Sequence, residues 1–463
     1  MDDNVIQPFR AGLAGTVIVP GEPGYDRARA VHNGLIDRKP ALIVRCIGAA
    51  DIRAALRFAV AEGLPVAIRG GGHSVAGHGT CDGGLLVDLS MMRGVRTDPL
   101  RRTVRVQGGA TLGDLDRETQ LHGLATPSGQ VSKTGIAGLT LSGGMGMLQR
   151  KYGLTCDNLL SADIVTADGS LVRASETEDA ELFWALRGGG GNFGVVTSFE
   201  FRAHPVTTVY GGLIAYPIDR AAEVLAFLRD FIADAPEELS ADAIFQHVPP
   251  IPVFPAEHIG KRVIGIFVRY AGTAEAGAEA IRPIRAFGTP IVDFVAPMDY
   301  TGVQSLLDPL NPFGGLNYWT GEYLPAFGAA EIDAVAEIGA TLPSGHSIVE
   351  VIPFNAAPTR IPTDATAFAQ RTESWLIHVM GQWQGPADTE RCRDWARAAG
   401  RTLRAFSHGN TYLNLVGDDE DTDRVRACWD DRRLARLAAV KARCDPDNMF
   451  RFNHNIALAE VSP

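Results

Sequence analysis

Long apolar runs are missing from this sequence, and so are paired cysteines. No uncharged apolar stretch approaches the roughly 18 residues that a membrane-spanning helix needs. The first residues, MDDNVIQPFRAG, lack the basic and apolar regions of a signal peptide. The six cysteines are scattered, without a C-x-x-C pair or the His and Cys spacing of a zinc site. These absences predict a cytoplasmic protein with buried free thiols, no membrane contact and no metal.

Basic residues are also in short supply. The chain of 463 residues carries 43 Lys and Arg against 54 Asp and Glu, a formal net charge of −11. This balance argues against nucleic acid or an anionic membrane as the main partner, because both are polyanions. Hydrophobic residues make up 46% of the chain, enough for a large core, and the length predicts two or three domains.

Glycine, in contrast, is concentrated in a few loops. The stretch RGGGHSVAGHG at residues 69–79 follows an apolar segment that predicts a buried strand, and a second cluster, GIAGLTLSGGMG, spans residues 135–146. Successive glycine N–H groups after a strand form a nest that suits a pyrophosphate. We therefore expect these two clusters to bring bare backbone close to an anionic group.

Two common nucleotide motifs do not account for these loops. The chain has no G-K-[ST] step, which excludes a P-loop. GGGNFG at residues 189–194 has G-x-G-x-x-G spacing, but it follows a predicted helix that opens at a Ser175 and Glu178 capping pattern. A Rossmann fingerprint needs a strand before the loop and a helix after it, so that interpretation fails.

The pattern of elements changes near residue 206. Before it, strands such as 40–46 alternate with helices such as 48–63 and 111–124, and a tight turn at Asp168 and Gly169 joins two strands. After it, alternating strands separated by helices predict an antiparallel sheet with helices on one face. A long helical region is expected at 421–450, followed by a tail that packs back on the first part.

Together these motifs resemble one family. The segments RGGGHSVAGHG, GGLLVDLSMMRGVRTD, HGLATPSGQVSKTGIAGLTLSGGMGMLQRKYGLTCDN and ELFWALRGGGGNFGVV, with the tail YLNLVGDDE…DPDNMFRFNHNI, are similar in order to the FAD-linked oxidases of the vanillyl-alcohol oxidase superfamily. Within it, the chain resembles the berberine-bridge-enzyme-like group, near the bacterial 6-hydroxynicotine-oxidase type.

The resemblance implies a fold and its division. We expect an α+β chain of PCMH type, with an FAD-binding domain at residues 1–205. An inserted substrate domain at 206–407 would carry the antiparallel sheet flanked by helices. A C-terminal berberine-bridge-like segment at 408–463 would return to the FAD domain.

The resemblance also implies how FAD is held. His73 matches the histidine that attaches through its side chain to the flavin 8α-methyl group. No second, cysteinyl link is expected, because the matching position is Val131, and Cys156 lies elsewhere as a packed thiol. His78 is expected to line the pocket. The residues implied to bind FAD are Arg69, Gly70, Gly71, Gly72, His73, Ser74, Gly129, Val131, Thr134, Gly135, Gly138, Leu139, Thr140, Gly143, Gly144, Gly146, Asp157, Asn158, Ile164, Val165, Gly194, Val195, Val196, Tyr412, Asn414 and Asn453.

The implied reaction is oxidation of a C–H bond next to N or O in a small or medium metabolite, as in secondary metabolism. A hydride passes to flavin N5, and O2 reoxidises the flavin with release of H2O2. Tyr412, Asn414 and Thr134 are the implied catalytic residues. Sugar-oxidising relatives carry a tyrosine base in a Y-x-N-Y segment, where this chain has Leu415, and leucine cannot accept a proton. Other candidate bases are Tyr318, Glu322, His346, Glu350 and His378.

Several alternatives stay open. Thr134 resembles the residue found in relatives that form a flavin-N5-oxide and oxygenate their substrates. A dehydrogenase that avoids oxygen and a non-enzymatic flavin carrier are further options. The expected partners are a small-molecule substrate and O2, and the expected assembly is a monomer or homodimer.

Overall fold

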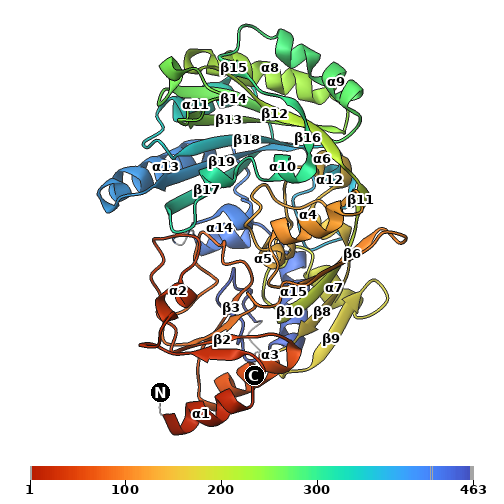
Figure 1. Cartoon of the computed structure of the whole chain (residues 1–463), viewed down its shortest axis with the longest axis vertical. Coiled ribbons are helices and arrows are strands. Elements are labelled where there is room, and N and C mark those ends of the chain that lie inside the picture. The colour runs from red at the N-terminus through yellow and green to blue at the C-terminus, as the bar shows by residue number, and fades with distance from the viewer. Residues whose placement is uncertain (1–2, 418, 420, 459–463) are drawn as a thin grey trace.

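The computed structural model describes residues 3–417, 419 and 421–458, and its elements fall into a lower and an upper part along the long axis (Figure 1). The lower part holds a four-stranded, a five-stranded and a small two-stranded sheet, and the upper part holds an eight-stranded sheet. Helices and mainly antiparallel strands are mixed throughout, which confirms the predicted α+β class.

The four-stranded sheet forms the N-terminal end of the lower part. Its order is β1-β2-β4-β3, with β4 parallel to both neighbours and β1 antiparallel to β2. Helix α3 connects β2 to β3 and buries Ile52 and Leu56 against this sheet. Gly63 follows the helix at φ +63°, a left-handed conformation that glycine adopts without strain. The bounds are α1 (Asp3–Ala11), β1 (Thr16–Ile18), α2 (Tyr25–Arg29), β2 (Leu42–Arg45), α3 (Ala49–Ala61), β3 (Val66–Arg69) and β4 (Leu85–Asp88).

The five-stranded sheet is antiparallel, in the order β5-β6-β10-β8-β9. Gly169, at φ +81°, closes the predicted turn between β8 and β9. Helix α7 begins later than the sequence predicted: Ser175 only closes a turn with the N–H of Glu178, and Asp179 caps the helix by accepting from the N–H of Leu182. The bounds are β5 (Val95–Asp98), β6 (Thr103–Gln107), α4 (Leu112–Gln120), β7 (Leu124–Ala125), α5 (Ile136–Leu141), α6 (Gln149–Tyr152), β8 (Leu159–Val165), β9 (Leu171–Ser175), α7 (Ala180–Ala185), β10 (Val195–Arg202) and β11 (His204–Pro205).

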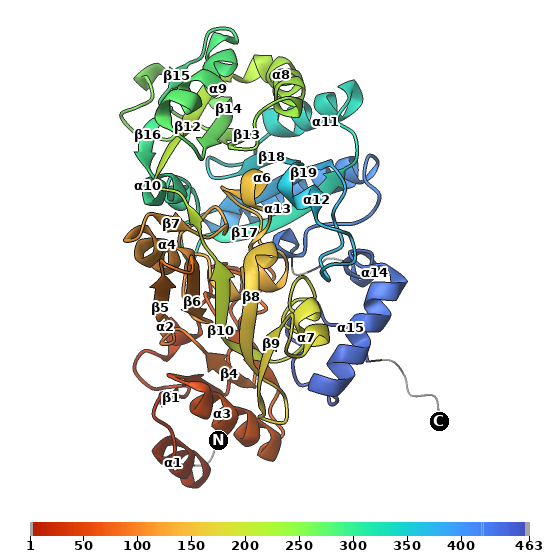
Figure 2. The ribbon, with the colours of Figure 1, turned by 90° about the vertical axis from the view of Figure 1, so that its right-hand side faces the viewer.

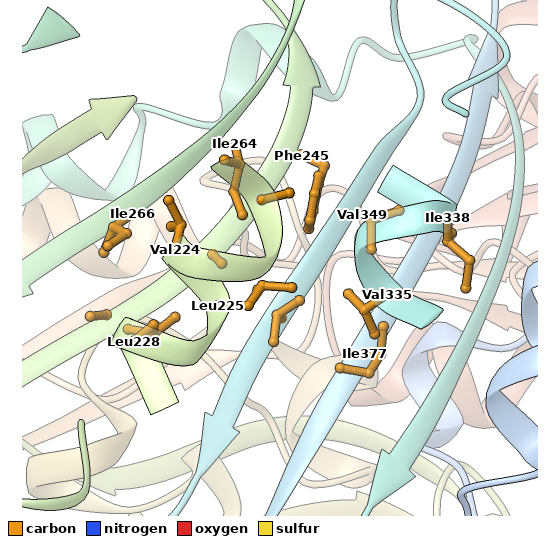
Figure 3. Close-up of a cluster of buried hydrophobic side chains, with 14 of the residues drawn as sticks. Val224, Leu225, Leu228, Phe245, Ile264, Ile266, Val335, Ile338, Val349 and Ile377 are labelled. Carbon is orange, nitrogen blue, oxygen red and sulfur yellow. The ribbon is translucent and has the colours of Figure 1, made fainter. Parts of the chain in front are cut away.

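The upper sheet runs β15-β12-β14-β13-β18-β19-β17, with β16 also paired to β12. Helices α8, α9, α11 and α13 bury one of its faces, where α8 packs Leu225 and Leu228 against strand residues such as Phe245 and Ile264 (Figure 3). The bounds are β12 (Thr208–Pro217), α8 (Ala221–Ala233), β13 (Leu239–His247), β14 (Arg262–Tyr270), α9 (Ala274–Ala286), β15 (Val292–Asp293), β16 (Ala296–Asp299), α10 (Tyr300–Gln304), β17 (Leu316–Leu324), α11 (Ala329–Ala340), β18 (Ile348–Phe354), α12 (Ala357–Arg360), β19 (Ser374–Trp383) and α13 (Thr389–Arg404).

The C-terminal segment returns to the lower part, where α15 lies beside α7 (Figure 2). The predicted long helical region is two helices, α14 (Thr422–Arg426) and α15 (Asp431–Cys444), because Asp430 caps a new helix by accepting from the N–H of Arg433 at 2.8 Å. Leu437 and Val440 of α15 pack into the lower core. Within the described residues, no helix combines the length and apolarity needed to cross a membrane.

Candidate active site

One large cavity lies between the glycine-rich loops of the lower part and the face of the eight-stranded sheet that the helices leave uncovered. Loops after β3 and around α5 build its lower wall, and β17, β18 and β19 contribute to its upper wall. The predicted FAD contacts that line it are Gly70, Gly71, Gly72, His73, Ser74, Gly129, Val131, Thr134, Gly135, Gly138, Leu139, Gly146, Gly194, Val196, Tyr412, Asn414 and Asn453.

Two backbone segments touch where Gly71 meets Gly135. A Cβ added at Gly135 would lie 2.6 Å from the Cα of Gly71, and one added at Gly71 would overlap the Cα and N of Gly135. Non-bonded carbon atoms normally sit about 3.5–4.0 Å apart. Gly146 is equally confined, because an added Cβ would lie 2.6 Å from the carbonyl oxygen of Gly129. The lower wall is therefore bare backbone, which suits a phosphate-bearing group.

His73 lines the cavity with its ring stacked on that of His32. The ring centroids are 3.8 Å apart and the planes differ by 16°. Nε2 of each ring is buried, with no hydrogen-bond partner among the described residues. Burial, reinforced by the neighbouring His32, lowers the pKa of His73 to about 3, and burial lowers the pKa of His32 to about 4. Both rings are thus neutral near pH 7, and His73 presents a nitrogen lone pair that no proton blocks.

Several residues predicted to contact FAD support the wall from behind. Arg69 is buried and donates to Asp88 at 2.7 Å and to the carbonyl oxygen of Ala30 at 3.1 Å. Thr140 donates to the carbonyl of Ile136 within α5. The predicted contacts that do not line the cavity are Arg69, Thr140, Gly143, Gly144, Asp157, Asn158, Ile164, Val165 and Val195.

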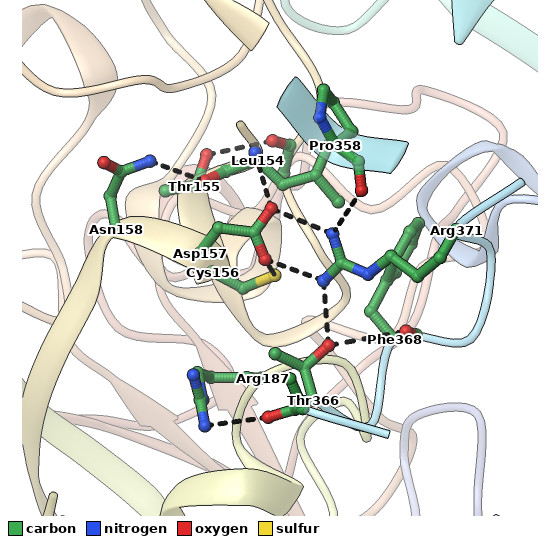
Figure 4. A network of polar contacts seen from close by, with 12 residues as sticks. Leu154, Thr155, Cys156, Asp157, Asn158, Arg187, Pro358, Thr366, Phe368 and Arg371 are labelled. Atoms are coloured by element: carbon green, nitrogen blue, oxygen red, sulfur yellow. Dashed lines mark hydrogen bonds and ion pairs between the residues drawn. The ribbon is translucent and has the colours of Figure 1, made fainter. Parts of the chain in front are cut away.

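Asp157 belongs to a buried ion pair (Figure 4). Its carboxylate oxygens accept from Nη1 and Nη2 of Arg371 at 2.9 and 2.7 Å. Arg371 also donates to Oγ1 of Thr366 and to the carbonyl of Pro358. Cys156 is buried beside this pair without lining the cavity, and burial raises the pKa of its thiol well above the usual range. The network ties the segment after α6 to the loop that precedes β19.

Tyr412 and Asn414 reach the cavity from the segment before α14. The hydroxyl of Tyr412 accepts from the N–H groups of Gly144 and Met145 at 2.9 and 3.1 Å, and from Nδ2 of Asn414 at 2.9 Å. Burial raises the pKa of Tyr412 to about 12. A protonated hydroxyl with three donors around it is suited to holding the 144–145 backbone in place.

Alternate residues of β18 and β19 point into the cavity and form part of its upper wall. Glu350 and His378 are paired in register, and Nδ1 of His378 lies 3.8 Å from Oε2 of Glu350. Nε2 of His378 is buried without a partner in the described part of the chain, and its ring meets Trp319 edge-on at 5.2 Å. Glu350 is the one Asp, Glu, Lys or Arg side chain among the described residues that line the cavity. Apolar residues around this pair are Ile244, Ile348, Ile352, Leu376, Met380 and Leu415.

Three other candidate bases do not line the cavity. Tyr318 and Glu322 alternate with Trp319 along β17, and Tyr318 packs on the helix-covered side of the sheet. Glu322 is buried in ion pairs with Arg404 and Arg424. His346 lies exposed in the turn before β18. Of the candidate bases on the eight-stranded sheet, the fold brings Glu350 and His378 to the cavity.

Sequence reasoning missed several residues here. Gln130 lines the cavity and donates through Nε2 to Oε1 of Glu350 at 2.9 Å. His454 also lines it and meets the expected lining residue His78 edge-on at 4.7 Å. Gln130 and His454 both lie inside motifs that carry the family resemblance, which was a usable signal, whereas nothing local marks His32. In the described part of the chain, no cluster of His, Cys, Asp and Glu could hold a metal ion.

The cavity fits FAD on observations of this structure alone. Bare glycine backbone forms one wall, where a side chain would collide with the chain itself. A neutral imidazole with an unpartnered nitrogen lies on that wall, and a mainly apolar surface that carries Glu350 and His378 faces it. The glycine backbone suits the pyrophosphate of FAD, the imidazole offers a point of attachment, and the apolar surface suits the flat ring system.

Comparisons with known proteins agree with this fit. Residues 40–175 match the family described as FAD binding domain, and residues 411–457 match the family described as berberine and berberine like. The chain is 31% identical to (R)-6-hydroxynicotine oxidase of Paenarthrobacter nicotinovorans, over 96% of this chain and 97% of the other. It is also 31% identical to an FAD-linked oxidoreductase of Dictyostelium discoideum, over 98% and 96% of the two chains. The crystal structure of 6-hydroxy-D-nicotine oxidase from Arthrobacter nicotinovorans superposes with a TM-score of 0.86 at 29% identity, covering 96% of this chain and 98% of that one.

Proposed function

Because the chain belongs to the berberine-bridge-enzyme-like family of FAD-linked oxidoreductases, we propose that it is an oxidase of a small amine or alcohol, with its FAD covalently held by His73. The bond oxidised is a C–H next to nitrogen or oxygen. The observation that carries this proposal is that two different surfaces face each other across the cavity. One is glycine backbone that bears the neutral His73, and the other bears Glu350 and His378. Bound FAD supplies the hydride acceptor at N5 and passes the electrons on to O2, with release of H2O2.

His73 is the attachment point in this proposal. Its unprotonated ring is a nucleophile, and the stack on His32 together with burial fixes its orientation. Val131 also lines the cavity and offers no thiol for a second bond. The glycines at Gly71 and Gly135 let the backbone approach the cofactor, and Tyr412 holds the neighbouring 144–145 segment.

His378 is the proton acceptor in this proposal, with Glu350 behind it. Nε2 of His378 is buried and unpartnered, so it is free to take a proton from the substrate nitrogen or oxygen. The carboxylate of Glu350, 3.8 Å from Nδ1, stabilises the imidazolium that forms. This pair takes the role of the tyrosine base that sugar-oxidising relatives carry at the position of Leu415.

The substrate that fits best is apolar and carries a basic nitrogen. Around the Glu350–His378 pair the wall is mainly aliphatic, with Trp319 against His378 and Gln130 bonded to Glu350. A lone carboxylate and an aromatic ring recognise an organic cation. A sugar would leave its hydroxyl groups against Ile348, Ile352 and Leu376, where hydrogen-bond partners are lacking.

The test is a screen of matched amines, alcohols and sugars with the flavin-loaded protein. Without oxygen, an oxidisable amine should bleach the flavin, and admitting air should restore the colour with one H2O2 per substrate. His378→Asn should slow bleaching by about 10²-fold or more, the usual contribution of a general base, while His346→Asn, outside the cavity, should not. Slow recovery in air would identify a dehydrogenase. Labelled oxygen in the product would identify the alternative, an oxygenase, that the resemblance at Thr134 left open.

A further inference from the structure

A second carboxylate lies behind Glu350, on the cavity-facing side of the sheet. In the pairing of β13 with β18, Ile244 lies opposite Glu350, and both line the cavity. Asp242 precedes Ile244 by two residues and therefore points to the same face. The amide Nε2 of Gln130 bridges the two acids, 2.9 Å from Oε1 of Glu350 and 3.4 Å from Oδ2 of Asp242.

Asp242 also contacts a buried cation. Nη1 of Arg269, from β14, lies 2.6 Å from Oδ2 of Asp242, and both side chains are almost fully buried. A polar chain thus runs from Arg269 through Asp242, Gln130 and Glu350 to His378. Its outer end at His378 lines the cavity, and its inner end is Arg269.

We propose that Asp242 is a positioning residue for the proton acceptor: it neutralises Arg269 and, through Gln130, holds Glu350 against His378. The inference rests on the proposed function of the Glu350–His378 pair. Without the Asp242 charge, Arg269 would face Glu350 unbalanced and compete with His378 for its carboxylate. The imidazolium formed during proton transfer would then be less stable.

Charged groups from several elements affect the ionisation of Asp242. Arg269 from β14 and Arg150 from α6 favour its charged form, and Glu350 from β18 opposes it. Arg150 is itself occupied by the carbonyl groups of Pro236 and Leu239 beyond α8 and by Asn355. His378, from β19, lies on the far side of Glu350. Burial raises the pKa of Asp242, and Arg269, 2.6 Å away, opposes that rise by favouring the carboxylate that neutralises it.

The decisive experiment compares pH profiles of kcat/KM for three forms of the flavin-loaded enzyme. Asp242→Asn keeps the shape and removes the charge, and should move the acid limb down by about one pH unit, because an uncompensated cation nearby weakens a base. The double variant Asp242→Asn with Arg269→Met removes both charges and should bring the limb back towards the parent. A merely structural defect would not be repaired by a second buried substitution.

An activity-independent readout completes the test. Burial raises the pKa of Asp242, so difference infrared spectra of the resting enzyme should show a buried carboxyl gaining a proton as the pH falls, and Asp242→Asn should lack that band. An unshifted acid limb in Asp242→Asn, or a double variant as displaced as the single one, would overturn the inference. If His378→Asn and Glu350→Gln keep full activity, the proposed function itself fails; if they lose it while Asp242→Asn behaves as the parent, only the positioning role fails.

Discussion

Replacing Gly135 with alanine should impair the incorporation and placement of FAD without unfolding the protein. The backbone at Gly135 has φ −75° and ψ 135°, which alanine adopts freely, so the effect is purely one of space. The new Cβ would lie 2.6 Å from the Cα of Gly71, about 1 Å inside normal contact. Gly135 cannot retreat, because the flanking Ile136 N–H and Thr134 carbonyl are bonded to Ala110 and Leu112 at 3.0 and 2.9 Å.

The two glycine loops must therefore separate, and with them the cofactor moves relative to the upper wall. A misplacement of about 1 Å in a catalytic arrangement costs roughly 10²-fold in rate. We expect a lower flavin-to-protein absorbance ratio and an anaerobic flavin reduction rate reduced by about that factor. Gly302→Ala is the matched control, since nothing lies within 4 Å of its added Cβ. A Gly135→Ala enzyme with full flavin content and parental reduction rate would refute the account of the glycine wall.

Three further perturbations test other parts of the structure. Leu228→Ala, in the fully buried upper core, should cost about 2–5 kcal/mol of stability; an unchanged thermal midpoint would contradict this packing. Arg371→Gln leaves Asp157 buried without its partner and should cost about 3–5 kcal/mol, measured by urea unfolding at pH 7. Burial lowers the pKa of His32 from 6.5 to about 4 on folding. Between these two pH values the unfolded chain binds a proton at His32 that the folded chain does not, so the folded state loses stability as the pH falls from 6.5 to about 4. His32→Phe should therefore lose less stability between pH 6.5 and 5 than the parent, and an equal loss would show that His32 does not titrate this way.

Local signals allowed much of the lower part to be predicted. The helix that ends at Gly63, the Asp168–Gly169 turn and the two glycine clusters each follow from residues adjacent in sequence. The boundary at Ser175 was wrong because Asp179 competes for the same role and wins the contact with Leu182. Which of two neighbouring residues caps a helix depends on tertiary packing, and packing cannot be read from the sequence.

The upper wall of the site was harder to predict. Strands β13 and β17 are difficult to predict from sequence because they are buried on both faces and carry polar residues such as Asp242 and Asn317 where apolar ones are usual. The sequence indicated five candidate bases besides Tyr412, but it did not show the strand register that brings Glu350 and His378 together. Gln130 and Glu350 are 220 residues apart, and only the fold brings them together.

The mass of the denatured protein tests the proposed covalent attachment of FAD to His73 most directly. The parent chain should keep one FAD after denaturation, as should His78→Ala, whose histidine lines the same cavity. His73→Ala should show the mass of the bare chain. Flavin that stays attached in His73→Ala, or that leaves the parent on denaturation, would contradict the claim.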